Sequence, residues 1–404
     1  MQEKIQVLFF KITIYLTRFI LMLMPEYKPT VFCGKGSSQQ LIESIGHLGA
    51  KKIMIVTDAV LVKVGVIKPI QKALAAQGIE VEVFDGVEPD PNFSVVDAGI
   101  AKMNDSQCDS ILAIGGGSSI DAAKVIALAV SSKKTARQMI GLYKGRNKML
   151  PLYAIPTTSG TGSEVTIAAV VSDSETQEKL LVIDGKVVPL MVALDAEIMQ
   201  GMPQHITAAT GLDALTHSVE SYVSYINDPT CNQYALTACR MIMKNLTKAY
   251  DDGKDLDARG AMAMASYSGG IALSKNFLGY VHSIAHQFGG RYHTPHGIAN
   301  AIILPYVLEF SKPAITDQLA ALAKESELGE ASDSNAVLAD KFIAKIKAMK
   351  EHMQIPETLE ALKEEDVVSI AEGALEDAHK TYPVPLYMNQ MECEQLIRKM
   401  LPAA

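Results

Sequence analysis

The apolar residues of this chain change their spacing near residue 204. Before that point, short apolar runs alternate with stretches in which apolar residues recur every three or four positions. The short runs predict buried strands and lie at 53–57, 81–84, 110–114 and 152–155. The stretches between them predict helices, for example at 66–77 and 93–106. Strands and helices that alternate in this way predict a parallel sheet with helices on its faces.

After Pro203 the strand pattern disappears. Long stretches with helical spacing follow, beginning with 208–225, 230–250 and 258–274. The sequence therefore predicts an α/β N-terminal domain at 27–203 and an all-α C-terminal domain at 204–404. Ligands often bind between the domains of such enzymes, and we expect the active site there.

Residues 1–26 form an apolar N-terminal extension. Residues 7–24 are almost wholly apolar, and Lys4, Lys11 and Arg18 are seven positions apart, so on a helix they share one stripe. No small-residue cleavage site follows, which disfavours a secretory signal peptide. A membrane-spanning helix would place two charges in hydrocarbon. We therefore expect a helix that docks on protein or on a membrane surface, with its basic stripe in water.

The composition is that of a soluble globular protein large enough for two domains. The chain has 404 residues, of which 48% are hydrophobic and 20% charged. Its net charge of −8 disfavours a non-specific nucleic-acid binder. The five cysteines are scattered and form no C-x-x-C pair, which argues against a disulfide framework or a thiolate zinc site. This cysteine usage fits a reducing cytoplasm.

A glycine-rich loop follows the predicted strand at 110–114. It reads Gly115-Gly116-Gly117-Ser118 and leads into a helix that carries Asp121. Glycines let the backbone approach a phosphate closely, and the start of the next helix supplies free N–H groups. The alternative is a tight turn without a ligand. A second loop, at 156–164, also follows a strand and is rich in hydroxyls and glycines, so it could hold a diphosphate or a nicotinamide amide.

Asp58 directly follows the predicted strand at 53–57. An acidic residue at the carboxyl end of a strand can accept hydrogen bonds from both ribose hydroxyls of adenosine, and it repels a 2′-phosphate. By itself, Asp58 is equally well explained as the N-cap of a helix.

Histidines are concentrated in a short part of the predicted helical domain. Four of the nine lie between positions 282 and 296, namely His282, His286, His293 and His296. Upstream, Asp213 and His217 are four positions apart, so they share one face of a helix. One aspartate with two or three histidines is a plausible ligand set for a divalent metal such as iron or zinc. The spacing alone leaves open which of the four later histidines bind the metal.

These motifs together resemble those of one known family. They are Gly115-Gly116-Gly117-Ser118 with Asp121 and Lys124, Thr157-Thr158 with Gly160-Thr161, Asp213-Ala214-Leu215-Thr216-His217, His282-Ser283-Ile284-Ala285-His286 and Thr294-Pro295-His296-Gly297. In order and spacing they closely resemble the iron-containing (group III) alcohol dehydrogenases, from about Pro29 to the C-terminus. The resemblance implies a dinucleotide-binding α/β domain, a helical metal-binding domain and an active site in the cleft between them.

The resemblance also implies roles for individual residues. The metal ligands would be Asp213, His217, His282 and His296, and His286 would be an unligated histidine near the nicotinamide and the substrate. The residues expected to contact NAD are Asp58 on the ribose, Gly115, Gly116, Gly117 and Ser118 on the diphosphate with Asp121 in the same motif, and Thr157, Thr158 and Lys179 along the cofactor.

The chain departs from the family pattern at a few positions. Besides the extension, Ser119 replaces a proline of many members, Ser159 replaces an alanine and His293 replaces an asparagine of several relatives. These changes leave the reaction class in place and make the substrate uncertain.

The function we expect is hydride transfer between NAD(H) and a small alcohol or aldehyde. A divalent metal, Fe²⁺ with Zn²⁺ as the alternative, would stabilise the negative charge on the substrate oxygen. His286 would relay the alcohol proton, with His293 as the second candidate. The alternatives are a glycerol-dehydrogenase-like or dehydroquinate-synthase-like enzyme on the same fold, and a non-catalytic protein that binds nucleotide or metal. We further expect a cytoplasmic homodimer, with residues 1–24 as a peripheral contact to a membrane surface.

Overall fold

The four predicted buried strands all lie in one six-stranded sheet. They correspond to β2 (Lys52–Val56), β3 (Glu80–Phe84), β4 (Ser110–Gly115) and β6 (Leu152–Pro156) in the computed structural model. β1 (Thr30–Cys33) and β9 (Met191–Leu194) complete the sheet in the order β1-β9-β6-β4-β2-β3, with every pair of neighbours parallel. The sequence pattern did not predict β1 and β9, which have only four residues each, too few to establish a period.

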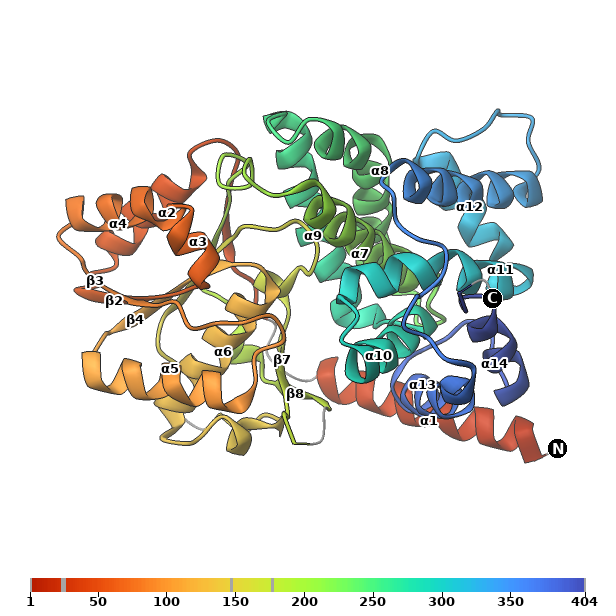
Figure 1. Ribbon diagram of the computed structural model, residues 1–404, viewed down its shortest axis with the longest axis horizontal. Coiled ribbons are helices and arrows are strands. Elements are labelled where there is room, and N and C mark those ends of the chain that lie inside the picture. Colours follow the sequence, from red (N-terminus) through yellow and green to blue (C-terminus); the bar gives the residue numbers. More distant parts are fainter. Residues whose placement is uncertain (1, 23–26, 146–147, 176–177, 403–404) are drawn as a thin grey trace. The chain divides into compact units, whose positions relative to one another are not determined.

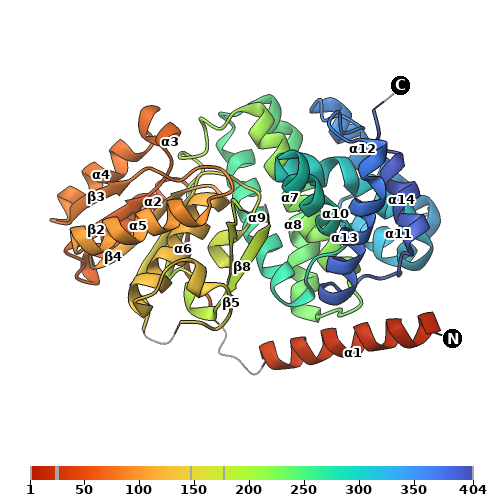
Figure 2. The ribbon, with the colours of Figure 1, turned by 60° about the horizontal axis from the view of Figure 1, so that its bottom comes forward.

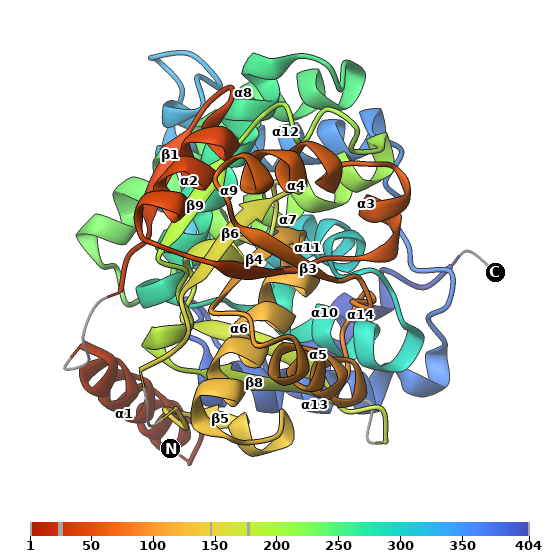
Figure 3. The ribbon, with the colours of Figure 1, turned by 90° about the vertical axis from the view of Figure 1, so that its left-hand side faces the viewer.

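Helices cover both faces of this sheet, as expected for parallel strands with continuous apolar runs. α2 (Ser37–His47) and α4 (Ile67–Ala76) pack on one face, and α5 (Phe93–Ser106) and α6 (Gly117–Ser132) pack on the other (Figure 3). Side chains of β2 alternate between the two apolar layers: Ile53 and Ile55 face α2 and α4, whereas Met54 and Val56 face α5 and α6.

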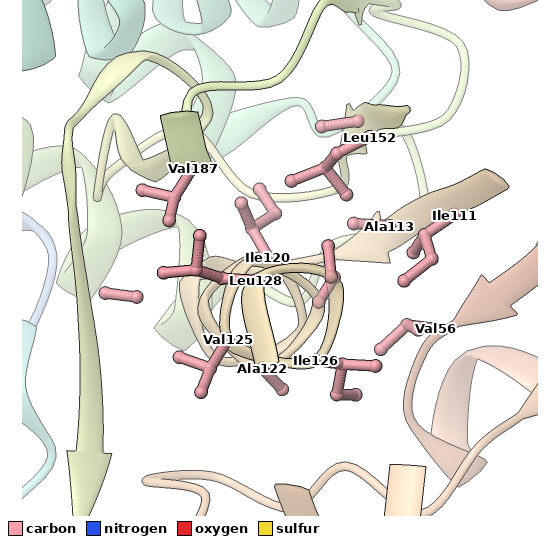
Figure 4. Close-up of a cluster of buried hydrophobic side chains, with 14 of the residues drawn as sticks. Val56, Ile111, Ala113, Ile120, Ala122, Val125, Ile126, Leu128, Leu152 and Val187 are labelled. Carbon is pink, nitrogen blue, oxygen red and sulfur yellow. The ribbon is translucent and has the colours of Figure 1, made fainter. Parts of the chain in front are cut away.

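α6 is the most deeply buried helix of the α/β part. Ile120 and Ile126 of α6 face side chains of the large sheet, including Ala113 and Val56, and Leu128 lies next to Val187 (Figure 4). Because α6 begins at the glycine loop, this packing fixes the direction in which the start of the helix points.

A buried lysine ties α6 to a second, smaller sheet. This sheet contains β5 (Gly141–Leu142), β8 (Lys179–Ile183) and β7 (Ala168–Ser172). The Nζ atom of Lys124 donates to Thr166 O at 2.9 Å, Thr166 Oγ1 at 3.0 Å and Ala168 O at 2.7 Å. Asp121, one helical turn earlier, accepts from Val170 N at 3.0 Å and from the Ser163 hydroxyl. The two charged residues therefore hold the end of the second loop and the start of β7 against α6.

The C-terminal half is helical, as predicted. The expected helices at 208–225, 230–250 and 258–274 are α7 (Gln204–Val223), α8 (Pro229–Asp251) and α9 (Leu256–Asn276). The later helices are α10 (Tyr280–Tyr292), α11 (His296–Glu325), α12 (Asn335–His352), α13 (Val367–Thr381) and α14 (Gln390–Arg398). Among the described residues, only α11 has the length and hydropathy of a membrane span, and 61% of its most apolar window is buried in the protein, as in a core helix.

The structure describes residues 2–22, 27–145, 148–175 and 178–402, and these form two units (Figure 1). The α/β unit contains Pro25–Met202 and Gly253–Tyr267, and the helical unit contains Met1–Met24, Pro203–Asp252 and Ser268–Ala404. Two segments thus belong to another unit than a division between residues 203 and 204 would give them. The extension belongs to the helical unit, and the segment with the first half of α9 belongs to the α/β unit.

The N-terminal extension forms α1 (Gln2–Met22), which lies along the outside of the helical unit, next to α13 (Figure 2). Ile14 is buried, Lys11 Nζ lies 5.2 Å from the ring centroid of Tyr225, and Arg18 pairs with Asp228 at 3.4 Å. The expected orientation was therefore wrong for the two basic residues whose side chains are described. They face the protein, because an aromatic ring and a carboxylate are there to receive them.

The face of α1 that points to solvent is apolar, where the sequence had predicted the basic stripe. Its large exposed side chains are Leu8, Phe9, Ile12, Tyr15, Leu16 and Phe19, each between 47% and 65% exposed. By area, six such side chains expose several hundred Å², which is as large as the largest apolar patch on a typical monomer.

Candidate functional site

Three neighbouring strands of the large sheet end at the same edge, next to residues that the sequence predicted to bind NAD. In the parallel register, Val56 pairs with Ala113 and Gly115 pairs with Pro156. Asp58 after β2, the glycine loop after β4 and Thr157 after β6 therefore lie side by side at the carboxyl edge.

At this edge, between β2 and β4, the helices that follow the two strands pass to opposite faces of the sheet. The chain leaves β2 toward α4 on one face of the sheet, and it leaves β4 into α6 on the other. Between two such strands the loops diverge and leave a crevice, which is where open α/β sheets bind their ligands. Asp58 and Gly115 lie on the two sides of the position where such a crevice is expected.

The glycine loop packs tightly against the second loop. Gly115 has φ 156°, a region that favours glycine, and a Cβ atom there would lie 2.4 Å from Ser119 Oγ. A Cβ atom on Gly117 would lie 2.7 Å from the Thr161 methyl group. Thr157 N donates to Gly115 O at 2.9 Å. Gly117 is therefore needed for the contact between the loops, and Gly115 for the tight turn into α6. The N-cap residue of α6, Gly116, has no side chain to cap the first turn, whose N–H groups can bind an anion.

Other predicted cofactor residues already have partners within the protein. Asp58 is the N-cap of α3 (Ala59–Lys63), and its Oδ1 accepts from Leu61 N at 2.9 Å. Lys179 pairs with Asp90 at 2.7 Å, and Asp121 holds the segment that leads to β7, as described above. The alternative interpretation of Asp58 as a helix cap is thus correct, and its contact with a ribose remains a prediction.

In the helical unit, Asp213, His217 and His282 lie close enough together to share one metal ion, and His296 lies beside Asp213. α7 carries Asp213 and His217, α10 carries His282 and α11 begins with His296. The Oδ1 atom of Asp213 lies 3.8 Å from Nε2 of His217, 3.8 Å from Nε2 of His282 and 3.7 Å from Nε2 of His296. A tetrahedral ion with bonds of about 2.1 Å holds its ligands about 3.4 Å apart, so a small inward movement would complete such a site.

A close contact between helices brings His296 to this point. A Cβ atom on Gly297 would lie 2.4 Å from the carbonyl oxygen of Ala209 in α7. Only glycine therefore lets the start of α11 approach α7 this closely.

The electrostatics of the four side chains suit a cation. Asp213, His217 and His282 are buried, whereas the side chain of His296 is 31% exposed. Burial by itself would raise the pKa of Asp213, but the three histidines and the Asn300 amide hold it below its ordinary value. Burial and the neighbouring His217 lower the pKa of His282 well below its usual range. The site thus combines an ionised carboxylate with a neutral imidazole, the forms that bind metals.

Asn300 adds a buried amide beside these donors. Its Nδ2 lies 2.7 Å from Asp213 Oδ1 and 3.2 Å from Nε2 of both His282 and His296. An ionised carboxylate only accepts hydrogen bonds, so the amide must present N–H groups to it. Asn300 Oδ1 is buried and has no hydrogen-bond partner in the described part of the chain. An ionised carboxylate beside imidazole nitrogens is a donor set that divalent metals take, so the residues fit a divalent metal.

The two remaining histidines differ in their surroundings. His286 is 31% exposed, its ring stacks on His296 at 5.7 Å between centroids, and its Nδ1 lies 3.3 Å from Asp377 Oδ2. His293 is exposed and ends α10 with φ 54°. This left-handed conformation is one that glycine and asparagine adopt more readily than histidine. His286 therefore lies beside the ligands, and His293 forms a helix cap.

Sequence reasoning missed Glu220. This residue lies three positions after His217 on α7, is 5% exposed, and its Oε2 lies 2.6 Å from His282 Nδ1. Its Oε1 accepts from Val281 N at 2.7 Å. Burial raises the pKa of Glu220 to about 7, against the opposing effect of the amides of Val281 and Gly279. The sequence spacing could have pointed to Glu220, because Asp213, His217 and Glu220 follow the i, i+4, i+7 pattern of residues on one face of a helix.

Comparisons with known proteins identify the family of this chain. The family model described as iron-containing alcohol dehydrogenase matches residues 28–196, and the model of the C-terminal domain of the Fe-containing alcohol dehydrogenase family matches residues 207–401. The chain is 37% identical over 368 residues to alcohol dehydrogenase 4 of Saccharomyces cerevisiae strain YJM789, covering 90% of this chain and 95% of the relative. It is 35% identical over 375 residues to the NAD-dependent methanol dehydrogenase of Bacillus methanolicus, covering 92% and 98%.

A solved structure shows the same fold. The crystal structure of a 1,3-propanediol oxidoreductase superposes with a TM-score of 0.89 at 36% identity, covering 94% of this chain and all of that chain. The extension at residues 1–26 lies outside both matched family models. The chain therefore belongs to the iron-containing alcohol dehydrogenase family, and it is a metal-dependent oxidoreductase whose family uses iron and NAD.

Proposed function

We propose that Asp213, His217, His282 and His296 hold the catalytic iron, and that the enzyme oxidises small primary or secondary alcohols or reduces their carbonyl products. The observation that carries this proposal is the convergence of one buried carboxylate and three imidazoles from three helices. When bound, the metal polarises the substrate oxygen and NAD accepts or gives the hydride. Fe²⁺ is the ion we expect, and Zn²⁺ fits the same donors.

The α/β unit supplies the residues that bind and orient the dinucleotide. The uncapped start of α6 and the amides of Gly115, Gly116, Gly117 and Ser118 offer donors to a diphosphate. The hydroxyls of Thr157 and Thr158, on the neighbouring loop, and the ammonium group of Lys179 would contact parts of the cofactor beyond the diphosphate. Asp121 would act indirectly, by holding the second loop.

His286 would transfer the alcohol proton. Its ring lies next to a metal ligand, it is partly exposed, and Asp377 fixes its Nδ1. A histidine in this position can pass the alcohol proton toward water. The named relatives act on methanol and 1,3-propanediol, so short alcohols and diols are the first substrates to test.

The assembly and location of the enzyme are further proposals. We place it in the cytoplasm, in agreement with its five free cysteines, and we expect a homodimer, as the resemblance to the family implies. The apolar outer face of α1 would lie against a lipid surface. Because Lys11 and Arg18 are engaged with the protein, this contact would depend on apolar burial and little on anionic headgroups.

The metal site gives the first prediction. His217→Ala or His282→Ala should remove most bound metal and abolish NADH formation from a panel of alcohols while the protein stays folded, because three ligands hold a divalent ion far less tightly. Wild-type activity should disappear on chelation and return when Fe²⁺ is added back. His205→Ala, which changes an exposed histidine of the same helix, is the matched control. Wild-type metal content in both ligand variants would refute the ligand set.

The second prediction concerns cofactor choice. The wild type should have a higher kcat/KM for NAD⁺ than for NADP⁺, because the Asp58 carboxylate repels a 2′-phosphate. Asp58→Asn keeps the helix cap and removes the charge, so it should reduce the preference by on the order of 1–3 kcal/mol. A ratio of specificity constants that is the same in the variant and the wild type would show that Asp58 only caps α3.

The third prediction tests the proton relay. His286→Ala should keep metal and NAD binding but lower kcat by about 10²–10⁴-fold, the usual contribution of a general acid–base group. His293→Ala should leave kcat near the wild-type value. If the His286 variant keeps the wild-type kcat and pH–rate profile, the relay belongs to His293 or to water.

The fourth prediction concerns α1. In flotation experiments, full-length protein should bind zwitterionic and anionic vesicles similarly, with little effect of salt, and protein lacking residues 1–24 should not bind while remaining an active dimer. Phe9→Ser with Phe19→Ser should weaken binding, and Val337→Ser, an exposed apolar residue of α12, should not. Absence of vesicle binding together with dissociation of the truncated dimer would show that α1 contacts a second subunit instead.

A further inference from the structure

Glu220 lies behind the metal ligand His282, at the junction of two helices. It projects from α7, which carries Asp213 and His217, toward the start of α10, which carries His282. Its two carboxylate oxygens have different partners: Oε1 accepts from Val281 N at 2.7 Å, and Oε2 lies 2.6 Å from His282 Nδ1. The carboxylate thus joins two of the three ligand-bearing helices through a single side chain.

A close backbone approach makes this junction possible. A Cβ atom on Gly279 would lie 2.8 Å from Glu220 Oε1, so any larger residue there would displace the carboxylate. The amide of Gly279 also contacts the carboxylate. Negative charge is favourable at this position, because the first N–H groups of α10 point toward it.

The hydrogen bonds at the two ends of the His282 ring indicate one tautomer. Asn300 must direct its N–H groups toward Asp213, and the same nitrogen lies 3.2 Å from His282 Nε2, which is consistent with a lone pair there. The proton of a neutral His282 then resides on Nδ1 and is donated to Glu220 Oε2. This is the tautomer whose Nε2 can bind a metal.

We propose that Glu220 is a positioning residue for the metal site, which holds His282 with Nδ1–H bonded to the carboxylate and Nε2 directed at the ion. The inference rests on the proposed ligand set. It extends that set outward, because a carboxylate behind a histidine ligand fixes the ring and makes the coordinating nitrogen a better electron donor.

Replacement of Glu220 by glutamine is the most selective change. A carboxamide has one accepting oxygen, whereas the site has two N–H donors, on Val281 and His282. In one orientation of the introduced carboxamide, its NH₂ group opposes Val281 N–H. In the other orientation the NH₂ group faces His282 Nδ1, which favours the tautomer with a proton on Nε2, and that proton would occupy the direction of the metal.

The test is metal affinity of the folded apoprotein, measured by chelator competition for Zn²⁺ and, without oxygen, for Fe²⁺. Glu220→Gln should raise the dissociation constant by about 10–100-fold, the usual effect of losing such a partner. The absorption spectrum of bound Co²⁺ should also change in intensity, since the ligand geometry is no longer fixed. Circular dichroism of the apoprotein confirms that the variant is folded.

Two further variants keep the result interpretable. Gly279→Ala should also weaken metal binding, because the added methyl group displaces Oε1, and it decides the question if Glu220→Gln does not fold. Asp184→Asn is the control, since Asp184 is a buried carboxylate of the α/β unit that likewise accepts from two backbone amides, those of Gly145 and Lys186. It should leave the dissociation constant within about twofold of the wild type.

These measurements distinguish a failure of the role of Glu220 from a failure of the proposed ligand set. If the wild type binds one ion, His282→Ala loses it, and Glu220→Gln or Gly279→Ala binds metal with wild-type affinity and Co²⁺ spectrum, then Glu220 has no positioning role. If His282→Ala itself retains the wild-type affinity, the proposed ligand set is wrong.

Discussion

A carboxylate in the interior of the helical unit is the constraint on which the rest of this site depends. Asp213 is 2% exposed, and an ionised carboxylate at that depth is costly unless cations or N–H donors surround it. Here three imidazoles and one amide converge on it, which explains why polar side chains lie at the contact of α7, α10 and α11, where apolar packing would otherwise be expected. Glu220 is a second buried carboxylate, behind the ligand His282, and it too is surrounded by N–H donors, those of Val281 and His282. A divalent cation at the proposed site would balance the charge of Asp213.

The α/β unit is governed by a different requirement, the close approach of backbone segments. Gly117 leaves room for Thr161, so that two loops from neighbouring strands pack against each other at the start of α6, and Gly115 leaves room for Ser119 in the turn before it. The buried pair of Lys124 and Asp121 then fixes the far end of the second loop. The proposed phosphate site would be made by the backbone and would need few charged side chains, in agreement with the acidic composition of the whole chain.

Much of this architecture could be predicted from the sequence, for identifiable reasons. Strands such as β4 are apolar on both faces and helices such as α5 have clear periodicity, so their positions were predicted to within one or two residues. The four proposed ligands were identified because their motifs keep the spacing of a known family. Other features depend on tertiary contacts. The sequence does not reveal that Tyr225 and Asp228 would draw Lys11 and Arg18 of α1 inward, and β1 and β9 are too short to show a pattern. Glu220 was overlooked because its partner His282 is 62 residues away.

The central claim is that Asp213, His217, His282 and His296 bind one metal ion. Diffraction from crystals of the iron-loaded enzyme, recorded on both sides of the iron absorption edge, tests it directly. We expect one strong anomalous peak per chain at about 2.0–2.3 Å from Asp213 Oδ1 and from the Nε2 atoms of the three histidines, with Glu220 still bonded to His282 Nδ1. A fully active, iron-loaded enzyme whose anomalous peak lies elsewhere, with these four side chains unligated, would contradict it.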